Sequence, residues 1–112
     1  MSKIRFRSNT VLALYSDFHE KTSGWWYGVA KSEWEHWQNQ SLVILMRESN
    51  NVYYLLLNPD EAVALLSKCG QDYKGYKKIN IRRPTSSGGI YLIEWNEFPL
   101  SSRICPLQVS WR

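Results

Sequence analysis

Residues 41 to 70 read SLVILMRESNNVYYLLLNPDEAVALLSKCG and contain the strongest structural signals in the chain. Two almost continuous apolar runs, 42–46 and 52–57, flank the polar stretch 49–51, which is typical of a tight hairpin turn. Neither run alternates with polar residues, so both faces of the hairpin are expected to be covered. The stretch therefore predicts two central antiparallel strands.

A capped helix is predicted directly after this hairpin. Asn58 suits the N-cap, and Pro59 suits the first helical position, where no backbone N–H is needed. Lys68 suits the negative end of the helix dipole, and Gly70 can end the helix in a left-handed conformation. The buried side is expected to consist of Val63, Leu65 and Leu66.

The remaining elements are weaker. Residues 3–7 alternate like a half-buried strand, and 10–18 fit a buried strand better than a helix, with 25–30 as the antiparallel partner through the turn 19–24. Residues 31–40 predict a short helix in which Ser32 and Glu35 have the spacing of a capping box. Residues 76–83 and 90–95 predict strands joined by the turn 84–89, and 96–111 are irregular. The order predicts an α+β fold in which two helices pack on an antiparallel or mixed β-sheet.

Composition places limits on the class of protein. The chain has 112 residues, of which 44% are hydrophobic and 21% charged, so one globular domain spanning 1–112 is expected and a disordered chain is excluded. The apolar runs are too short to span a bilayer, and no signal-peptide pattern follows the N-terminus. Two cysteines, Cys69 and Cys105, are too few for a disulfide scaffold of this size. We expect a cytoplasmic protein with no membrane partner and free thiols.

Tryptophan is concentrated between residues 24 and 40, which hold four of the six. Trp34 and Trp37 lie three apart, the spacing of a core-facing helical stripe. Trp25 and Trp26 are adjacent in a predicted strand, so their side chains point to opposite faces. At least one of the two rings can therefore meet solvent or a ligand. That ring either packs in the core or lies at a binding or subunit surface, and both alternatives stay open. We expect a homo-oligomer in which Trp25 or Trp26 lies at the interface.

A basic and aromatic stretch, DYKGYKKINIRR, occupies residues 72–83. Basic side chains contact phosphates and aromatic rings stack on bases, so the stretch is a candidate for binding nucleic acid. A solvated edge strand guarded by lysines is the structural alternative. Lys3, Arg5 and Arg7 extend the patch if the two strands are close. The candidate binding residues are Tyr73, Lys74, Tyr76, Lys77, Lys78, Arg82 and Arg83.

Catalytic and metal-binding patterns are weak. The segment around His19 lacks the second histidine of the HExxH zinc motif, and no CxxC or Cys/His spacing suggests a metal. The triplet Gly89-Ile90-Tyr91 is not followed by the Tyr-Ile-Gly of a GIY-YIG nuclease. The sequence thus predicts no catalytic residue, no metal site and no cofactor.

Several motifs occur in a fixed order: WYGV at 26–29, a helix with a large aromatic, SLVILM at 41–46, YYLLLNPDEAVALL at 53–66, KKINIRR at 77–83, and YLIEW with LSSRICPL at the end. In this order residues 25 to 107 resemble small α+β modules found beside restriction and modification proteins. The resemblance implies an accessory, non-catalytic domain that contacts DNA. A protein carried by a mobile element is the alternative.

The sequence is therefore compatible with three functions. The first is a non-catalytic interaction module that self-associates, indicated by the surplus of aromatic residues. The second is a nucleic-acid-binding accessory domain that uses the basic and aromatic strand. The third is a small-molecule binder or an enzyme without a recognisable motif.

Overall fold

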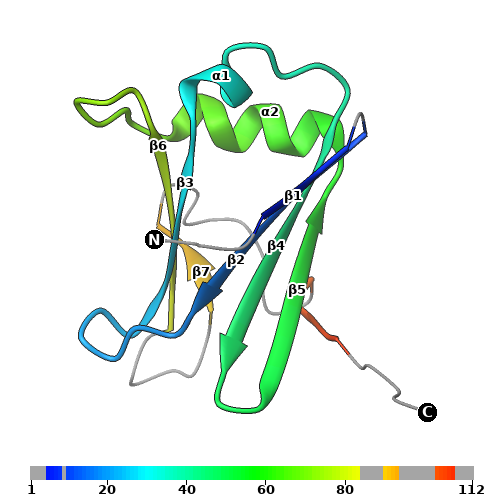
Figure 1. The fold of residues 1–112 in the computed structure, drawn as a ribbon. Coiled ribbons are helices and arrows are strands. Elements are labelled where there is room, and N and C mark those ends of the chain that lie inside the picture. The colour runs from blue at the N-terminus through cyan, green and yellow to red at the C-terminus, as the bar shows by residue number, and fades with distance from the viewer. Residues whose placement is uncertain (1–4, 9, 84–89, 94–102, 108–112) are drawn as a thin grey trace.

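Two β-sheets face each other across a shared apolar core, and two helices lie across one end (Figure 1). This computed structural model describes residues 5–8, 10–83, 90–93 and 103–107. The fold is α+β, as expected, with strands contributing more residues than helices. Neither helix in this described part is long and apolar enough to cross a membrane.

The larger sheet is mixed and has the strand order β1-β2-β4-β5-β8. Its parallel pair is β2 with β4, and its other pairs are antiparallel. The bounds are Arg5–Arg7 for β1, Val11–Asp17 for β2, Ser41–Glu48 for β4, Asn51–Leu57 for β5 and Cys105–Pro106 for β8. The predicted hairpin of residues 41–57 is confirmed as β4 and β5, with Ser49 in the turn at a φ of 56°.

The smaller sheet is antiparallel and has the order β3-β6-β7. Its strands are β3 at Gly24–Val29, β6 at Lys77–Arg82 and β7 at Tyr91–Leu92. The predicted pairing of 76–83 with 90–95 is confirmed over two residue pairs, Ile81 with Leu92 and Arg82 with Tyr91. The predicted turn at 84–89 and most of the segment 96–111 lie outside the described residues.

The core lies between the inner faces of the two sheets. The larger sheet contributes alternate residues of β2, β4 and β5, and the smaller sheet contributes alternate residues of β3 and β6, as the period of two in a strand dictates. The principal members are Leu12, Leu14, Leu42, Ile44, Met46, Leu55, Leu57, Trp25, Tyr27, Val29, Ile79 and Ile81. A single sheet with helices packed on it was expected; the second sheet takes the place of that helical layer.

One expected strand pairing is wrong. Residues 11–17 form a strand, β2, but its partners are β1 and β4 and not β3. Only an isolated bridge between His19 and Gly24 links the chain on either side of the turn. The strand β3 instead carries Trp25, Tyr27 and Val29 across to the opposite side of the core, where β6 pairs with it.

The hairpin is also less enclosed than expected. Its inner face is buried, but the opposite face of β4 and β5 is half-buried or exposed, and Leu56 is 50% exposed. The expectation that both faces are covered is therefore wrong. A run of apolar residues does not distinguish a strand covered on two faces from one that presents an apolar face to solvent.

Helix α2, Pro59–Lys68, confirms the predicted start. The Oδ1 atom of Asn58 accepts from the backbone N–H of Glu61 at 2.8 Å, and the Glu61 carboxylate accepts from the N–H of Asn58 at 3.1 Å. Leu65 and Leu66 are buried as predicted, together with Ala62. Val63, however, faces solvent at 50% exposure, so its assignment to the core is wrong.

The helix end differs from the expectation. The C-cap Cys69 is extended, with φ −80° and ψ 138°, and Gly70 does not have a positive φ. The Nζ of Lys77 donates instead to the carbonyls of Leu66 and Cys69, at 2.7 and 3.4 Å. The ammonium group of Lys77, on the next strand, therefore satisfies carbonyl groups at the end of α2. In many helices such carbonyls accept hydrogen bonds from backbone N–H groups at and after a left-handed glycine.

Helix α1, Lys31–Trp34, is shorter than the predicted span of 31–40. It begins after Ala30, whose N–H donates to the Glu33 carboxylate at 3.0 Å, so the expected capping by Ser32 and Glu35 is wrong. Because the helix ends at Trp34, Trp37 is not on it, and the two rings do not form a helical stripe. Both rings are nevertheless partly buried and pack against the core, as expected.

Candidate functional site

The outer face of the larger sheet is a continuous apolar surface. We call it the apolar face. On β2, β4 and β5 it comprises Val11, Ala13, Tyr15, Val43, Leu45, Val52, Tyr54 and Leu56, and all of them are half-buried or exposed. The helix α2 directs Ala62, Leu65 and Leu66 into the core on the inner side. No described helix or strand covers the apolar face.

A polar cluster borders the apolar face where β2 and β4 end. The Tyr15 hydroxyl donates to Asp17 at 3.0 Å, and Arg47 donates to that hydroxyl at 3.3 Å. Arg47 Nε lies 3.9 Å from the Asp17 carboxylate, an exposed ion pair. The hydrogen bond with Tyr15 is the main reason that the pKa of Arg47 is raised above its ordinary value, with the Tyr15 and Asp17 charges adding to it. Because β2 and β4 are parallel and in register, Asp17 and Arg47 are direct neighbours.

A different surface lies on the outer side of the smaller sheet. We call it the tryptophan face, made of Trp26, Tyr76, Lys78, Asn80 and Arg82. Trp26 lies opposite Asn80 on β6, with Lys78 and Arg82 at the diagonal positions. The Lys78 Nζ is 4.9 Å from the Trp26 ring centroid, and the His19 ring is 5.7 Å away at an angle of 30°.

The Tyr76 ring extends the tryptophan face along the sheet, where it lies over Gly28 next to Trp26. A Cβ placed on Gly28 would lie 3.2 Å from Cδ2 of Tyr76, so the absence of a side chain at Gly28 lets the ring lie on the sheet. Trp26 and Gly28 are two residues apart on one face of β3, a spacing of about 6.6 Å. The face therefore presents two aromatic rings in a row, with Lys78 beside them.

The tight turn at 72–76 sits at the end of this face. Asp72 Oδ1 accepts from the backbone N–H groups of Lys74 and Tyr76 at 2.8 and 3.0 Å, and Gly75 has a φ of 86°. Burial of Asp72 raises its pKa, but these two backbone hydrogen bonds and Lys78 outweigh burial, and the net pKa is lowered. Tyr73 is 92% exposed at the tip, with the Lys74 Nζ 5.6 Å from its ring centroid.

The structure divides the predicted nucleic-acid-binding residues into two groups. Lys77 and Arg83 are engaged within the fold: Lys77 binds the end of α2, and Arg83 pairs with Glu48 at 2.5 Å. The Arg83 guanidinium also lies 5.3 Å from the Trp25 ring. The others lie on the tryptophan face or in its turn: Tyr73, Lys74, Tyr76, Lys78 and Arg82.

The possible extension of this patch by N-terminal basic residues is not brought about by strand pairing. The strand that carries Arg5 and Arg7, β1, pairs with β2 at the edge of the larger sheet, whereas β6 belongs to the smaller sheet. The side chains of Lys3, Arg5 and Arg7 lie outside the described part of the chain.

The two adjacent tryptophans have different environments. Trp25 is 2% exposed and lies in the core, so it is excluded as a subunit-interface residue. Trp26 is half-buried on the tryptophan face. Trp34 and Trp37 line a shallow groove of about 220 Å³ between the helices, and their indole N–H groups donate to the carbonyls of Gly75 and Gln40.

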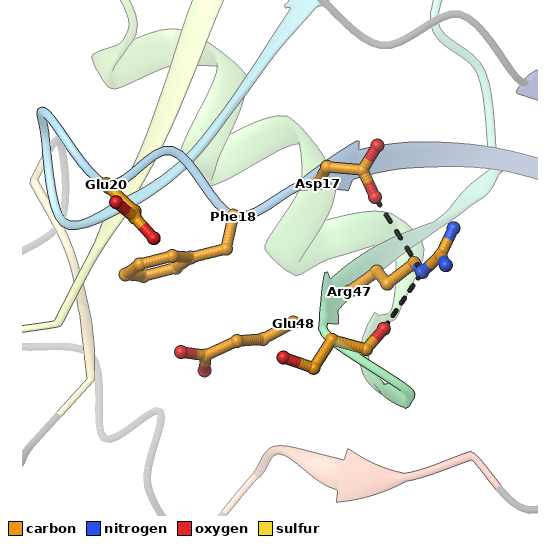
Figure 2. Close-up of a pocket in the computed structure, with 6 residues that line it drawn as sticks. Asp17, Phe18, Glu20, Arg47 and Glu48 are labelled. Atoms are coloured by element: carbon orange, nitrogen blue, oxygen red, sulfur yellow. Dashed lines mark hydrogen bonds and ion pairs between the residues drawn. The ribbon is translucent and has the colours of Figure 1, made fainter.

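An acidic pocket of about 360 Å³ opens where the larger sheet ends (Figure 2). Its lining comprises Asp17, Phe18, Glu20, Arg47, Glu48 and Ser49. Figure 2 shows Arg47 beside the Asp17 carboxylate. The Nε of Arg47 also donates to the Ser49 carbonyl at 3.1 Å. Glu48 is paired with Arg83 outside the pocket. Two of the three carboxylates that line the pocket, those of Asp17 and Glu48, are therefore paired with arginines.

Catalytic chemistry gains no support from the other reactive groups. Among the described residues, no cluster of three or more His, Cys, Asp or Glu side chains is placed to hold a metal ion. Cys69 is buried, with its thiol against the Leu65 carbonyl at 3.3 Å, and it is not joined to Cys105 by a disulfide. Cys105 lies beside Tyr54 at the rim of the apolar face, and their hydrogen bond is the main reason that the pKa of Tyr54 is raised.

Comparison with known proteins found no family model, no curated protein and no solved structure that matches the chain. The resemblance to modules of restriction and modification proteins therefore remains a prediction.

Sequence reasoning found the tryptophan face in part and missed the apolar face. The basic and aromatic residues of 72–83 indicated β6 and the turn before it as a binding surface. They did not indicate that the His19 ring lies beside Trp26 on the same face. The apolar face gave no separate signal, because its residues belong to the same apolar runs as the core. The acidic pocket joins two segments that are distant in sequence, which no local pattern reveals.

Proposed function

We propose that the protein is a non-catalytic interaction module that self-associates through the apolar face of its larger sheet. The observation that carries this proposal is the set of incompletely buried apolar side chains on three neighbouring strands, of which Leu56 is 50% exposed. The largest apolar patch on a monomeric soluble protein is often functional, and contiguous patches of a few hundred Å² rimmed by polar residues mark interaction sites.

The size of the apolar face sets the expected strength. Three strands spaced about 4.8 Å apart and about 20 Å long give a footprint on the order of 300 Å². A standard stable interface buries about 800 Å² per partner, so a weak and reversible complex is expected. The dimer should form in the range of tens of micromolar, which corresponds to about 6 kcal/mol.

A second copy of the chain fits this surface because the charges at its border are self-complementary. Asp17 and Arg47 lie side by side at the ends of the parallel strands β2 and β4. A twofold axis along the boundary of these strands places Asp17 of each copy over Arg47 of the other. The same patch then serves both partners, as an isologous contact requires.

Sedimentation velocity between about 1 and 300 μM, a range chosen to bracket this affinity, tests the proposal. We expect the wild-type protein to shift reversibly from monomer to dimer. Leu45→Glu places a charge in the middle of the apolar face and should leave a monomer. Because Leu45 is half-buried, thermal melting checks that the variant is still folded. Val63→Glu is the control, because it places the same charge on an apolar residue that is 50% exposed and lies on α2.

The charge arrangement has its own test. Asp17→Arg should weaken the dimer by placing like charges opposite each other, and the double variant Asp17→Arg with Arg47→Asp should restore it. A wild-type chain that remains monomeric at the highest concentration contradicts the proposal. A dimer that Leu45→Glu does not affect shows that another surface is used.

A further inference from the structure

We propose that the tryptophan face binds single-stranded nucleic acid, with Trp26 as a stacking platform and Lys78 and Arg82 as phosphate contacts. This inference is independent of the proposed self-association, because it uses the outer face of the other sheet.

The aromatic part of the face has the geometry of a stacking surface. Trp26 is half-buried, so the sheet fixes its ring while part of the ring stays accessible. Tyr76 follows along the same face at the position of Gly28. The spacing of about 6.6 Å between these two positions is roughly twice the 3.4 Å rise per base of one DNA strand. Two bases of an extended strand can therefore occupy the two rings.

The charged part is complementary to a phosphate backbone. Lys78 and Arg82 lie diagonally on either side of Trp26 along β6, and Lys74 follows in the turn. From Tyr76 to Arg82 the strip is about 20 Å long, which spans about three nucleotides at the extended spacing of about 6.6 Å. The chain as a whole carries a formal net charge of +4, which favours encounter with an anion.

In the free protein the Lys78 ammonium lies over the face of the Trp26 ring, and it is also 3.7 Å from the Asp72 carboxylate. A lysine side chain is long and flexible, so a base can replace the ammonium over the ring while Lys78 turns to the phosphate. Asp72 competes with that phosphate for Lys78. Asp72 thus limits affinity, and removal of its charge should strengthen binding.

Single strands are favoured over duplexes by the same geometry. Rings that lie along a sheet can stack only on bases that are unstacked from their neighbours. DNA and RNA single strands share the phosphates and the base faces that this surface uses. The 2′-hydroxyl is the group that would distinguish them.

Fluorescence anisotropy with labelled oligo-dT, oligo-rU and a duplex of equal length tests the inference. We expect binding to both single strands, weaker binding to the duplex, and a steep loss of affinity with salt. The double variant Lys78→Gln with Arg82→Gln should weaken binding and reduce the salt slope by up to about 1.4, since a single strand loses about 0.7 per phosphate contact. Lys68→Gln, which removes a charge from α2, should have a much smaller effect.

Substitutions at Trp26 separate stacking from charge. Trp26→Leu should reduce affinity on the order of 10- to 100-fold with an unchanged salt slope, because stacking releases no counterions. Trp26→Phe retains a ring and should retain most of the affinity. Thermal melting of both variants checks that the fold is intact.

Asp72→Asn gives the sharpest test, because the amide oxygen still accepts the two backbone hydrogen bonds of the turn. We expect tighter binding than the wild type. No binding to any of the three probes at about 50 mM salt, where counterion release favours binding, overturns the inference. Binding that is unaffected by the Trp26, Lys78 and Arg82 variants also overturns it. The monomeric variant Leu45→Glu should bind the oligonucleotides as the wild type does, so the two proposals fail separately.

Discussion

The indole N–H of Trp25 donates a hydrogen bond of 3.0 Å to the carbonyl oxygen of Arg47, and this bond joins the two sheets. The same carbonyl also accepts from the backbone N–H of Phe18 at 2.8 Å. Below Trp25 on the same strand, the Tyr27 hydroxyl donates to the Leu45 carbonyl at 2.9 Å. Two polar groups on large rings thus fix how β3 lies against β4.

Trp25→Phe should destabilise the protein by about 1–3 kcal/mol, because it removes the hydrogen bond and leaves a gap in the core. The Arg47 carbonyl keeps its Phe18 partner, so no unsatisfied acceptor adds to the loss. Urea denaturation measures the free energy of unfolding. Trp26→Phe is the control and should cost less than about 1 kcal/mol, as expected for a half-buried position.

Tyr27 should make the protein sensitive to alkali. Burial raises the pKa of Tyr27 well above its ordinary value of 10.0, so the folded state retains a proton that the unfolded state loses. This contribution to stability is complete below about pH 10 and is lost as the pH rises further. Tyr27→Phe should be less stable at neutral pH and should lose less stability in alkali. Tyr73→Phe, at an exposed site, should leave the pH profile unchanged.

Glu61 should make a contribution that disappears in acid. The hydrogen bond from Arg103 is the main reason that the pKa of Glu61 is lowered from its ordinary value of 4.5. A lowered pKa stabilises the fold above the ordinary value, and this stabilisation is lost as the pH falls through the lower, folded-state pKa. Glu61→Gln keeps an acceptor for the helix cap and should cost about 0.5–1 kcal/mol at pH 7. The difference from wild type should shrink near pH 3, and a constant difference would contradict the assignment.

The packing of α2 can be tested with two neighbouring residues. Leu65→Ala should destabilise by about 2–5 kcal/mol, because the side chain is fully buried and its removal leaves a cavity. Val63→Ala should be neutral within about 0.5 kcal/mol, since Val63 faces solvent and alanine favours a helix. Chemical denaturation of the two variants gives the comparison. Equal losses would mean that the helix is rotated from the position described.

The parts of the fold that sequence predicts best are those set by neighbouring residues. The hairpin of β4 and β5 and the start of α2 follow from a turn, an N-cap and a proline within one short stretch. The partner of β2 could not be predicted, because an apolar strand pattern specifies a buried face and not the strand beside it. The strand β3 lies in a second sheet, where Trp25 and Tyr27 face the core from the side opposite to the larger sheet. A pattern within one strand does not predict this placement.

The two candidate surfaces illustrate the same limit. The chemistry of the tryptophan face was visible in the sequence, but the turning of Lys77 to α2 and of Arg83 to Glu48 depends on tertiary contacts. The apolar face was hidden, because Val43 and Leu45 alternate with equally apolar Leu42 and Ile44 on the inner side. Periodicity separates two faces only when their polarity differs.

The parallel pairing of β2 with β4 has a consequence for the order of folding during synthesis. The strands β4 and β5 are adjacent in sequence, and hairpins of this kind form within microseconds. The strand β2 leaves the ribosome earlier but has to wait for β3, α1 and β4 before its parallel partner exists. Until then its edge is unpaired and open to other extended chains. Aggregation during biosynthesis should therefore begin in the N-terminal strands, and a chaperone that shields residues 11–17 would suppress it.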